Sequence, residues 1–301
     1  MSAAAPGPLT RSRESTHRWL LLAPAMGLIG VFLLCPLAIV VLYSFLTPAT
    51  YGGVEWIFSV ESYVQFLFER DLFDDSLVFS SAYLEIYARS LVQALVATAV
   101  CLAVGFPMAY FIATRPPNQR TVWLLLVTVP YWVNLLIRTI AMLFVIRDQG
   151  PLNQALVGLG IIETPLRLAY TPLGVAIGLV YSYLPFMILP IYASIEKLDF
   201  RLVEAARDLY AHRWTALVTV VLPLVRPGIA AGCLLVFIPS LGSFIAPDLL
   251  GGGKELMIGN LIALQFQGSR NWPFGAAAAV ILMTVVLGAL LLYALQQRSN
   301  R

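Results

Sequence analysis

The stretch Glu204-Ala205-Ala206-Arg207-Asp208-Leu209-Tyr210-Ala211 is charged and helix-forming, and it stands between long apolar segments. Leu222-Pro223-Leu224 and Pro227-Gly228-Ile229 follow it, after which the chain is apolar again. A chain embedded in a membrane needs a polar hairpin of this kind only where a soluble partner docks. We therefore interpret 196–228 as an attachment segment for a partner. An ordinary helical connector lying on the lipid headgroups is the alternative with the same periodicity.

The composition of the rest of the chain indicates a bilayer. Of 301 residues, 59% are hydrophobic and 12% are charged, whereas soluble proteins carry about 25% charged residues. Six apolar runs reach the roughly 20 residues that a helix needs to cross the hydrocarbon. They are 19–46, 86–114, 121–146, 172–195, 229–247 and 273–296. We predict an all-α polytopic membrane protein with a transmembrane domain over 19–296 and tails at 1–18 and 297–301.

The placement of basic residues predicts the orientation. Twelve lie in segments on the side of the N-terminus: Arg11, Arg13, Arg18, Arg115, Arg120, Lys197, Arg201, Arg207, Arg213, Arg226, Arg298 and Arg301. Five lie on the other side: Arg70, Arg147, Arg167, Lys254 and Arg270. Cytoplasmic loops are enriched in Lys and Arg, so we expect both termini in the cytoplasm. Eleven acidic residues give the outer face a net charge of about −6, which could attract a cation or a basic partner. A solvated loop face that happens to be acidic is the alternative.

The sequence contains no recognisable catalytic, metal-binding or nucleotide-binding arrangement. Gly253-Lys254 resembles part of a phosphate loop, but Glu255 stands where that loop requires Ser or Thr. The only histidines, His17 and His212, are far apart in the sequence. We therefore expect no enzyme activity, no metal and no cofactor on this chain, and no nucleic-acid partner.

Two short helices are predicted within the attachment segment. Asp199 is a candidate N-cap for a helix from about 200 to 210. A second helix, from about 212 to 222, is expected to end at Pro223. Apolar residues recur at helical spacing on the first helix and form a narrow stripe: Leu202, Ala205, Ala206 and Leu209.

Polar and aromatic residues within the spans are candidates for a translocation path. Arg138 should have an acidic or carbonyl partner, because an unpaired charge costs roughly 2.5–3.5 kcal/mol at the bilayer centre. A structural tie between helices and contact with substrate are both open for Arg138, and Asn134, one turn earlier, fits either role. Aromatic faces suit an organic cation, although packing or an interfacial belt would also explain them. The remaining candidates are Tyr131, Trp132, Tyr181, Tyr183, Ser240, Ser243, Phe244 and Asp248.

The polar hairpin resembles the EAA loop of permease subunits of binding-protein-dependent ABC importers. Three stretches carry this resemblance at the usual spacing: Glu204-Ala205-Ala206 with Asp208-Leu209, then Leu222-Pro223-Leu224, then Pro227-Gly228-Ile229. From about 19 to 296 the chain is similar to the spermidine/putrescine permease (PotB/PotH) family. Pro130-Tyr131-Trp132, Leu184-Pro185-Phe186-Met187 and Asn271-Trp272-Pro273-Phe274-Gly275 carry that similarity. It implies the transmembrane fold of a type I ABC importer (MetI-like).

The resemblance also implies a function and partners. The chain would be a polyamine permease subunit of the bacterial cytoplasmic (inner) membrane. Its partners would be a cytoplasmic ABC ATPase dimer that binds ATP and Mg, a second similar permease subunit, an extracytoplasmic substrate-binding protein and the lipid bilayer. A permease for another small solute and an ATP-independent secondary carrier are the alternatives. By resemblance, the ATPase would contact Glu204, Ala205, Ala206, Arg207, Asp208, Leu209 and Tyr210.

One position departs from the family pattern. The residue after Asp208-Leu209 is usually Gly, which readily adopts a positive φ, and here it is Tyr210. We expect the first helix either to run further or to end in an ordinary turn. We expect assembly to survive, because the rest of the motif is intact.

Overall fold

The structure is a computed structural model that describes residues 8–70 and 77–299. It divides into two units, one formed by the segments up to Gln65 and from Gln265, the other by Phe66–Leu264. Within the described residues, five helices are long and apolar enough to cross a membrane, and a bent pair of helices would supply a sixth span. The acidic residues Asp71, Asp74 and Asp75, counted in the outer face, lie outside the described residues.

The first unit contains the two ends of the chain. Its elements are α1 (Pro8–Tyr43), β1 (Leu46–Pro48), β2 (Val54–Phe58), α2 (Glu61–Val64) and α13 (Trp272–Ser299). β1 and β2 pair antiparallel, α1 contacts α13, and the rings of Tyr43 and Trp272 stack with centroids 6.4 Å apart. α1 begins at Pro8 and α13 reaches Ser299, so helical structure extends into the predicted tails at 1–18 and 297–301.

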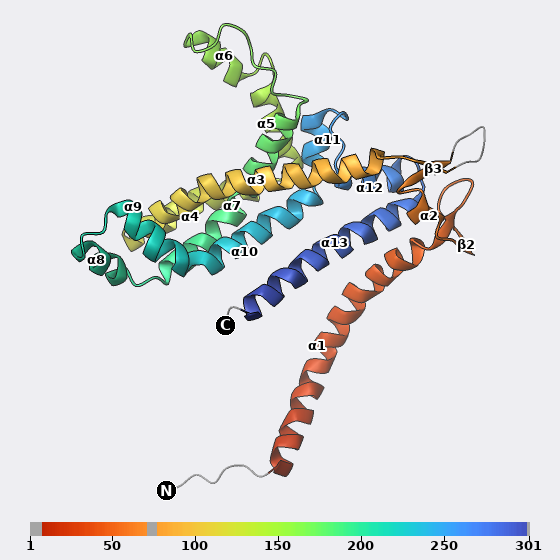
Figure 1. The fold of residues 1–301 in the computed structure, drawn as a ribbon, viewed down its shortest axis with the longest axis horizontal. Coiled ribbons are helices and arrows are strands. Elements are labelled where there is room, and N and C mark those ends of the chain that lie inside the picture. Colours follow the sequence, from red (N-terminus) through yellow and green to blue (C-terminus); the bar gives the residue numbers. More distant parts are fainter. Residues whose placement is uncertain (1–7, 71–76, 300–301) are drawn as a thin grey trace. The chain divides into compact units, whose positions relative to one another are not determined.

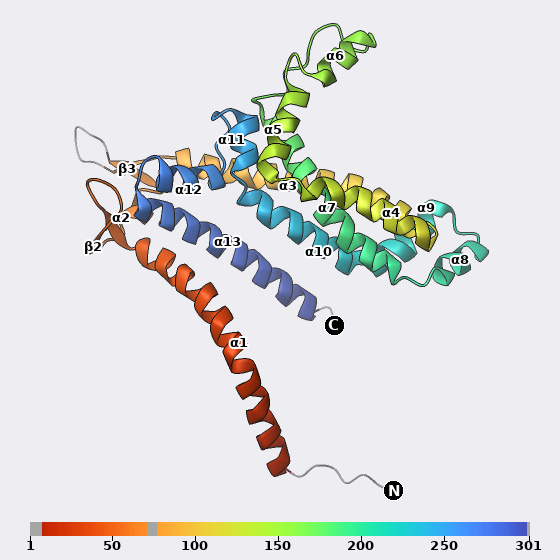
Figure 2. The ribbon, with the colours of Figure 1, turned by 180° about the vertical axis from the view of Figure 1, so that it is seen from behind.

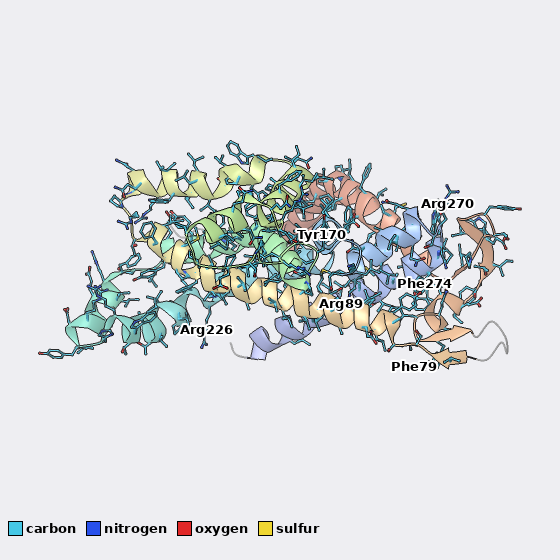
Figure 3. The ribbon with its side chains drawn as sticks, turned by 90° about the horizontal axis from the view of Figure 1, so that it is seen from above. Phe79, Arg89, Tyr170, Arg226, Arg270 and Phe274 are labelled. Carbon is cyan, nitrogen blue, oxygen red and sulfur yellow. The ribbon has the colours of Figure 1, made fainter. Side chains whose placement is uncertain are left out.

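Three helices form the core of the second unit. α3 (Ala82–Ala113), α7 (Pro172–Glu196) and α10 (Leu222–Leu241) lie side by side (Figure 1). Their contacts use small residues, which let membrane helices approach closely. A Cβ on Gly228 of α10 would collide with the Ser194 hydroxyl and lie 2.7 Å from the Pro190 carbonyl oxygen of α7. Arg89 of α3 and Arg226 of α10 lie toward different ends of this bundle (Figure 3).

Pro223 lies within a helix and does not end one, so that prediction is wrong. α9 (Arg213–Ala216), the π-helical turn η2 (Leu217–Val221) and α10 form one continuous helical span from Arg213 to Leu241. In the π turn the Leu222 N–H donates to the Leu217 carbonyl, five residues back. This change of hydrogen-bond register immediately precedes Pro223, which has no N–H to donate. The fifth span therefore begins inside the predicted hairpin and ends at Leu241, not near 247.

The third predicted span, 121–146, is not one continuous helix. α4 (Pro117–Thr128) and η1 (Val129–Trp132) are followed by α5 (Leu135–Ile146) and α6 (Pro151–Gly158), and the two pairs are bent by 95° relative to each other (Figure 2). Val133 is extended, and the Asn134 side chain accepts the Leu136 N–H at 2.8 Å. Asn134 is therefore the N-cap that starts a new helix, as short polar side chains do.

Shorter elements complete the chain. β3 (Phe68–Arg70) and β4 (Leu77–Phe79) form a second antiparallel pair. α8 (Arg201–Asp208) lies between α7 and α9, and α11 (Ile245–Gly251) and α12 (Ile258–Gln267) follow α10. α11 packs against α7, where Gly178 leaves room for Leu250. α8 and α9 extend from one end of the bundle of α3, α7 and α10 (Figure 1).

Candidate functional site

The first turn of α8 is held by a hydrogen bond to the side chain of Asp199 and by one buried residue. The Asp199 carboxylate accepts the Arg201 N–H at 3.0 Å, but the N-cap of α8 is Phe200, so Asp199 lies one residue before the cap and not at it as predicted. Val203 is only 6% exposed and belongs to the hydrophobic core, and Ala206 packs against that core. Of the predicted apolar stripe, Ala206 alone therefore joins the core, while Leu202 and Leu209 are exposed. Val203 was not predicted, although its spacing of three residues from Ala206 was a usable signal.

Tyr210 ends α8 in a way that neither sequence-based expectation described. Its φ is +61°, in the left-handed region that a glycine would adopt. The Tyr210 N–H donates to the Arg207 carbonyl at 2.9 Å, and the Ala211 N–H donates to the Ala206 carbonyl at 3.0 Å. These two bonds define a Schellman motif with Tyr210 at the C′ position. The helix neither continues nor ends in an ordinary turn, and the usual glycine geometry is retained by a tyrosine.

The remaining surface of α8 is not covered by any other described part of the chain. Leu209 is 83% exposed and Tyr210 is 99% exposed, and Leu202, in the first turn of α8, is half-exposed. The other predicted contact residues also lie on the exposed surface: Glu204, Ala205, Arg207 and Asp208. The hairpin can thus present an apolar patch bordered by both signs of charge, which is a surface suited to a soluble partner.

A polar cluster joins the start of α4 to the end of α7 from which α8 continues. Arg120 lies 3.8 Å from Glu196, and the Tyr192 hydroxyl donates to the same carboxylate at 2.8 Å. Arg120 also donates from Nε to the Arg115 carbonyl at 2.6 Å. A displacement of α8 would therefore act on two spans, through Val203 in the core and through Glu196 at this cluster.

Arg138 is buried at the second candidate site, beside the break between α4 and α5. Its side chain is 6% exposed, and its guanidinium carbon lies 4.3 Å from the centroid of the Tyr131 ring. The Tyr131 ring meets Phe186 edge to face at 4.9 Å. Nε has no hydrogen-bond partner, and no carboxylate of the described residues pairs with the guanidinium. The expected acidic or carbonyl partner is not found among the described residues, and within them a cation–π contact to Tyr131 holds Arg138.

Two other path candidates use their hydroxyl groups within this chain. The Tyr183 hydroxyl donates to the Pro239 carbonyl at 3.2 Å, and the Ser240 hydroxyl donates to the Val236 carbonyl at 2.7 Å. Tyr183 also lies 6.3 Å from Phe186, so the structure brings Tyr131, Tyr183, Phe186 and Arg138 together. Ser243 is buried, whereas the remaining candidates are exposed on the surface of this chain: Trp132, Tyr181, Phe244 and Asp248.

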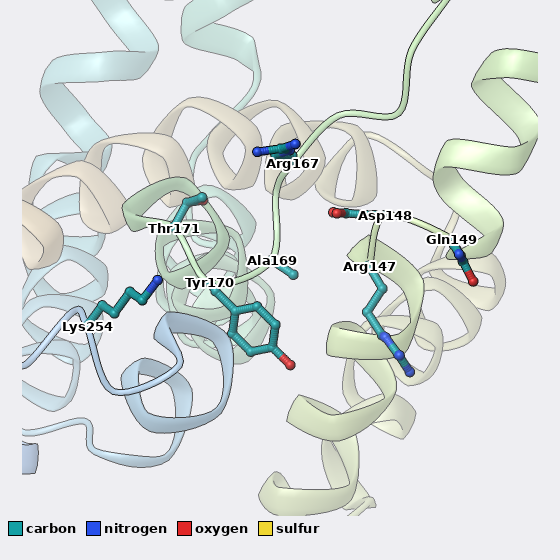
Figure 4. A pocket seen from close by; sticks show the side chains of 8 residues that line it. All are labelled: Arg147, Asp148, Gln149, Arg167, Ala169, Tyr170, Thr171 and Lys254. Carbon is teal, nitrogen blue, oxygen red and sulfur yellow. The ribbon is translucent and has the colours of Figure 1, made fainter.

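Sequence reasoning did not find a third polar site. A cavity of about 640 Å³ lies between the segment that joins α5 to α7 and the segment after α11 (Figure 4). It is lined by Arg147, Asp148, Gln149, Arg167, Ala169, Tyr170, Thr171 and Lys254. Three of the five basic residues counted on the outer side line this cavity. In the sequence, the only available signal for this site was that these three residues lie in two loops, between α5 and α7 and after α11.

Comparison with known proteins identifies the family. A family model described as a binding-protein-dependent transport system inner membrane component matches residues 83–301. The chain belongs to this family. It is 43% identical over 267 residues to the spermidine/putrescine transport system permease protein PotB of Escherichia coli (strain K12), covering 89% of this chain and 92% of that protein. Identity to the protein of the same name from Haemophilus influenzae is 42% over 270 residues, covering 90% and 89%.

Solved structures agree on the fold of this permease. A chain in the structure of a bacterial alginate ABC transporter, in complex with an alginate pentasaccharide-bound periplasmic protein, aligns with a TM-score of 0.67 at 19% identity. The alignment covers 95% of each chain. The predicted all-α importer fold is confirmed, and the protein is a multi-pass inner-membrane permease subunit of an ABC importer.

Proposed function

We propose that this permease carries spermidine, putrescine or a similar small organic cation into the bacterial cytoplasm, driven by ATP hydrolysis on a separate subunit. One observation carries the proposal: 43% identity, over 89% of the chain, to a relative named as a spermidine/putrescine permease. The matched length includes nearly all of both proteins, so the proposal does not rest on a shared fragment.

The exposed face of α8 is the attachment point of a cytoplasmic ABC ATPase dimer, which holds ATP and Mg. The predicted excess of basic residues on this side favours a cytoplasmic position for α8 and for both termini. Closure of the ATPase dimer displaces α8, and the displacement reaches the spans through Val203 and through the Arg120–Glu196 pair. A second, similar permease subunit completes the path, and an extracytoplasmic binding protein delivers the solute at the opposite end.

The cluster at the α4–α5 break supplies the substrate contact in this proposal. Tyr131, Tyr183 and Phe186 offer π faces to an ammonium group. Arg138 already occupies the Tyr131 face, so an incoming cation must compete with the guanidinium there. The exposed residues Trp132, Tyr181, Phe244 and Asp248 remain available to the part of the path that lies against the second subunit.

Uptake into proteoliposomes tests the proposal. The complete importer is reconstituted with its binding protein. Entry of radiolabelled spermidine is then measured under three conditions: ATP in the lumen, ADP in the lumen, and no nucleotide. We expect uptake with ATP alone, and inhibition by unlabelled putrescine. Equal uptake without ATP would identify a secondary carrier. ATP hydrolysis stimulated by another solute, with no polyamine uptake, would overturn the proposed substrate, but the assignment as an ABC importer would stand.

A further inference from the structure

The cavity lined by Arg147, Arg167 and Lys254 lies at the opposite end of α7 from α8. Thr171 lines the cavity and is the N-cap of α7, and Glu196 ends that helix just before α8. α7 has 25 residues, so it separates the two sites by about 37 Å, more than the thickness of the hydrocarbon core. If α8 faces the cytoplasm, the cavity faces the extracytoplasmic side.

The backbone around the cavity is fixed by hydrogen bonds. Asn153 is 1% exposed, and its amide nitrogen donates to the Arg147 carbonyl at 3.1 Å and to the Leu166 carbonyl at 2.9 Å. Its side-chain oxygen accepts the Leu166 N–H at 2.9 Å. Asn153 therefore joins the segment that carries Arg147 to the segment that carries Arg167. The positions of these charges are set before any partner arrives, which lowers the entropy cost of binding.

The third cationic segment is fixed as well. The Tyr170 N–H donates to the Leu250 carbonyl at 2.7 Å, with Tyr170 at a φ of +62°. Arg89 donates to the Lys254 carbonyl at 3.2 Å and lies 3.4 Å from the Glu255 carboxylate. These bonds hold the backbone of Lys254 and leave its ammonium group exposed at the cavity.

The cavity is positively charged on a side of the protein that the sequence predicts to be acidic. Three basic residues contribute to its lining, and two of their cationic groups, those of Arg167 and Lys254, border its space against the single carboxylate of Asp148. Figure 4 shows Arg167, Lys254 and Asp148 bordering the same space, whereas the Arg147 side chain points away. No ion pair is found for Arg167 or Lys254 within the described residues. Such a cavity repels a polyamine and attracts a carboxylate.

We infer that this cavity is the docking socket for an acidic side chain, Asp or Glu, that projects from the extracytoplasmic binding protein. Arg167 and Lys254 pair with the incoming carboxylate, and Asp148 opposes it. The socket thus selects the protein partner by a charge opposite to that of the transported solute. This inference rests on the proposed importer function and on the orientation that goes with it.

Affinity for the binding protein tests the inference. The complete importer in lipid nanodiscs is titrated with its purified, spermidine-loaded binding protein at low and high salt. We expect the double variant R167Q/K254Q to bind about tenfold more weakly at low salt and to lose most of the salt dependence. D148N should bind about threefold more tightly, because it removes the opposing charge.

Two controls separate docking from folding. R167K/K254R keeps both charges and should bind like the wild type, and R115Q removes a charge at the other end of α3 and should have no effect. The melting temperature of each complex shows that it is folded. Wild-type affinity in R167Q/K254Q, or weaker binding in D148N, would overturn the inference while the importer function stood. Failure of the wild-type importer to bind any binding protein would overturn the proposed function itself.

Discussion

Tyr210 shows how one residue can depart from a family pattern while the backbone keeps it. The departure itself is visible in the sequence. Its outcome depends on whether the last carbonyls of α8 are satisfied, and the bonds from Tyr210 and Ala211 satisfy them. A non-glycine residue in this region carries a strain of about 1–3 kcal/mol. The nearly full exposure of the ring means that no packing against the described residues offsets that strain.

Replacing Tyr210 with Gly should therefore stabilise the hairpin. We expect Tyr210→Gly to raise the free energy of unfolding by about 1 kcal/mol, because glycine adopts this conformation without strain. Thermal unfolding of the purified complex measures the change, and titration with the ATPase should show less than a tenfold change in affinity. A much larger change in affinity would contradict the expectation that this position tolerates substitution.

Arg138 gives a second prediction at this scale. An unpaired buried charge is destabilising, and replacement by an apolar residue of similar length is often neutral or stabilising. We expect Arg138→Met to raise stability by about 1 kcal/mol, since the desolvation penalty exceeds the roughly 2 kcal/mol of a buried cation–π contact. Arg138→Lys, which keeps the charge without the flat guanidinium, should be less stable than the wild type. A lower melting temperature for Arg138→Met in the assembled importer would reveal an acidic partner from another subunit.

At the scale of elements, the same residue type has opposite effects in two places. Pro130 lies in η1 next to a break, where Asn134 offers a cap for a new helix. Pro223 lies inside a continuous span, because the π turn before it changes the hydrogen-bond register. The sequence shows both prolines clearly. It does not show which backbone groups near each proline find other hydrogen-bond partners, so the bounds of the third and fifth spans could not be predicted. The spans 172–195 and 273–296 were predictable to within a few residues.

Close helix contacts can be tested at Gly228. An added Cβ would collide with the Ser194 hydroxyl of α7 and meet the Pro190 carbonyl, so we expect Gly228→Ala to destabilise the protein by about 1–3 kcal/mol. Gly27 on α1 has nothing within 4 Å of an added Cβ. Gly27→Ala is therefore the matched control and should not destabilise. Equal melting temperatures for the two variants would contradict the close α7–α10 contact.

At the scale of the whole molecule, the sequence predicted the class of protein and the polar hairpin, because both depend on composition and on a contiguous motif. It did not predict the cavity of Arg147, Arg167 and Lys254. Those residues come from segments about 90 positions apart, and only the fold brings them together. The aromatic cluster of Tyr131, Tyr183 and Phe186 has the same origin, since it joins η1 to α7.

In the proposed mechanism, α8 transmits the conformational change driven by ATP hydrolysis. ATP-driven spermidine uptake in proteoliposomes that contain the Glu204→Lys importer tests this transmission directly. Glu163→Lys makes the same charge change at an exposed site before the start of α7, and it serves as the control. We predict that Glu204→Lys lowers uptake by roughly tenfold or more, because reversing a charge within a docked surface costs several kcal/mol. Glu163→Lys should transport like the wild type. Undiminished ATP-driven uptake in Glu204→Lys would contradict the assignment of α8 as the contact with the ATPase.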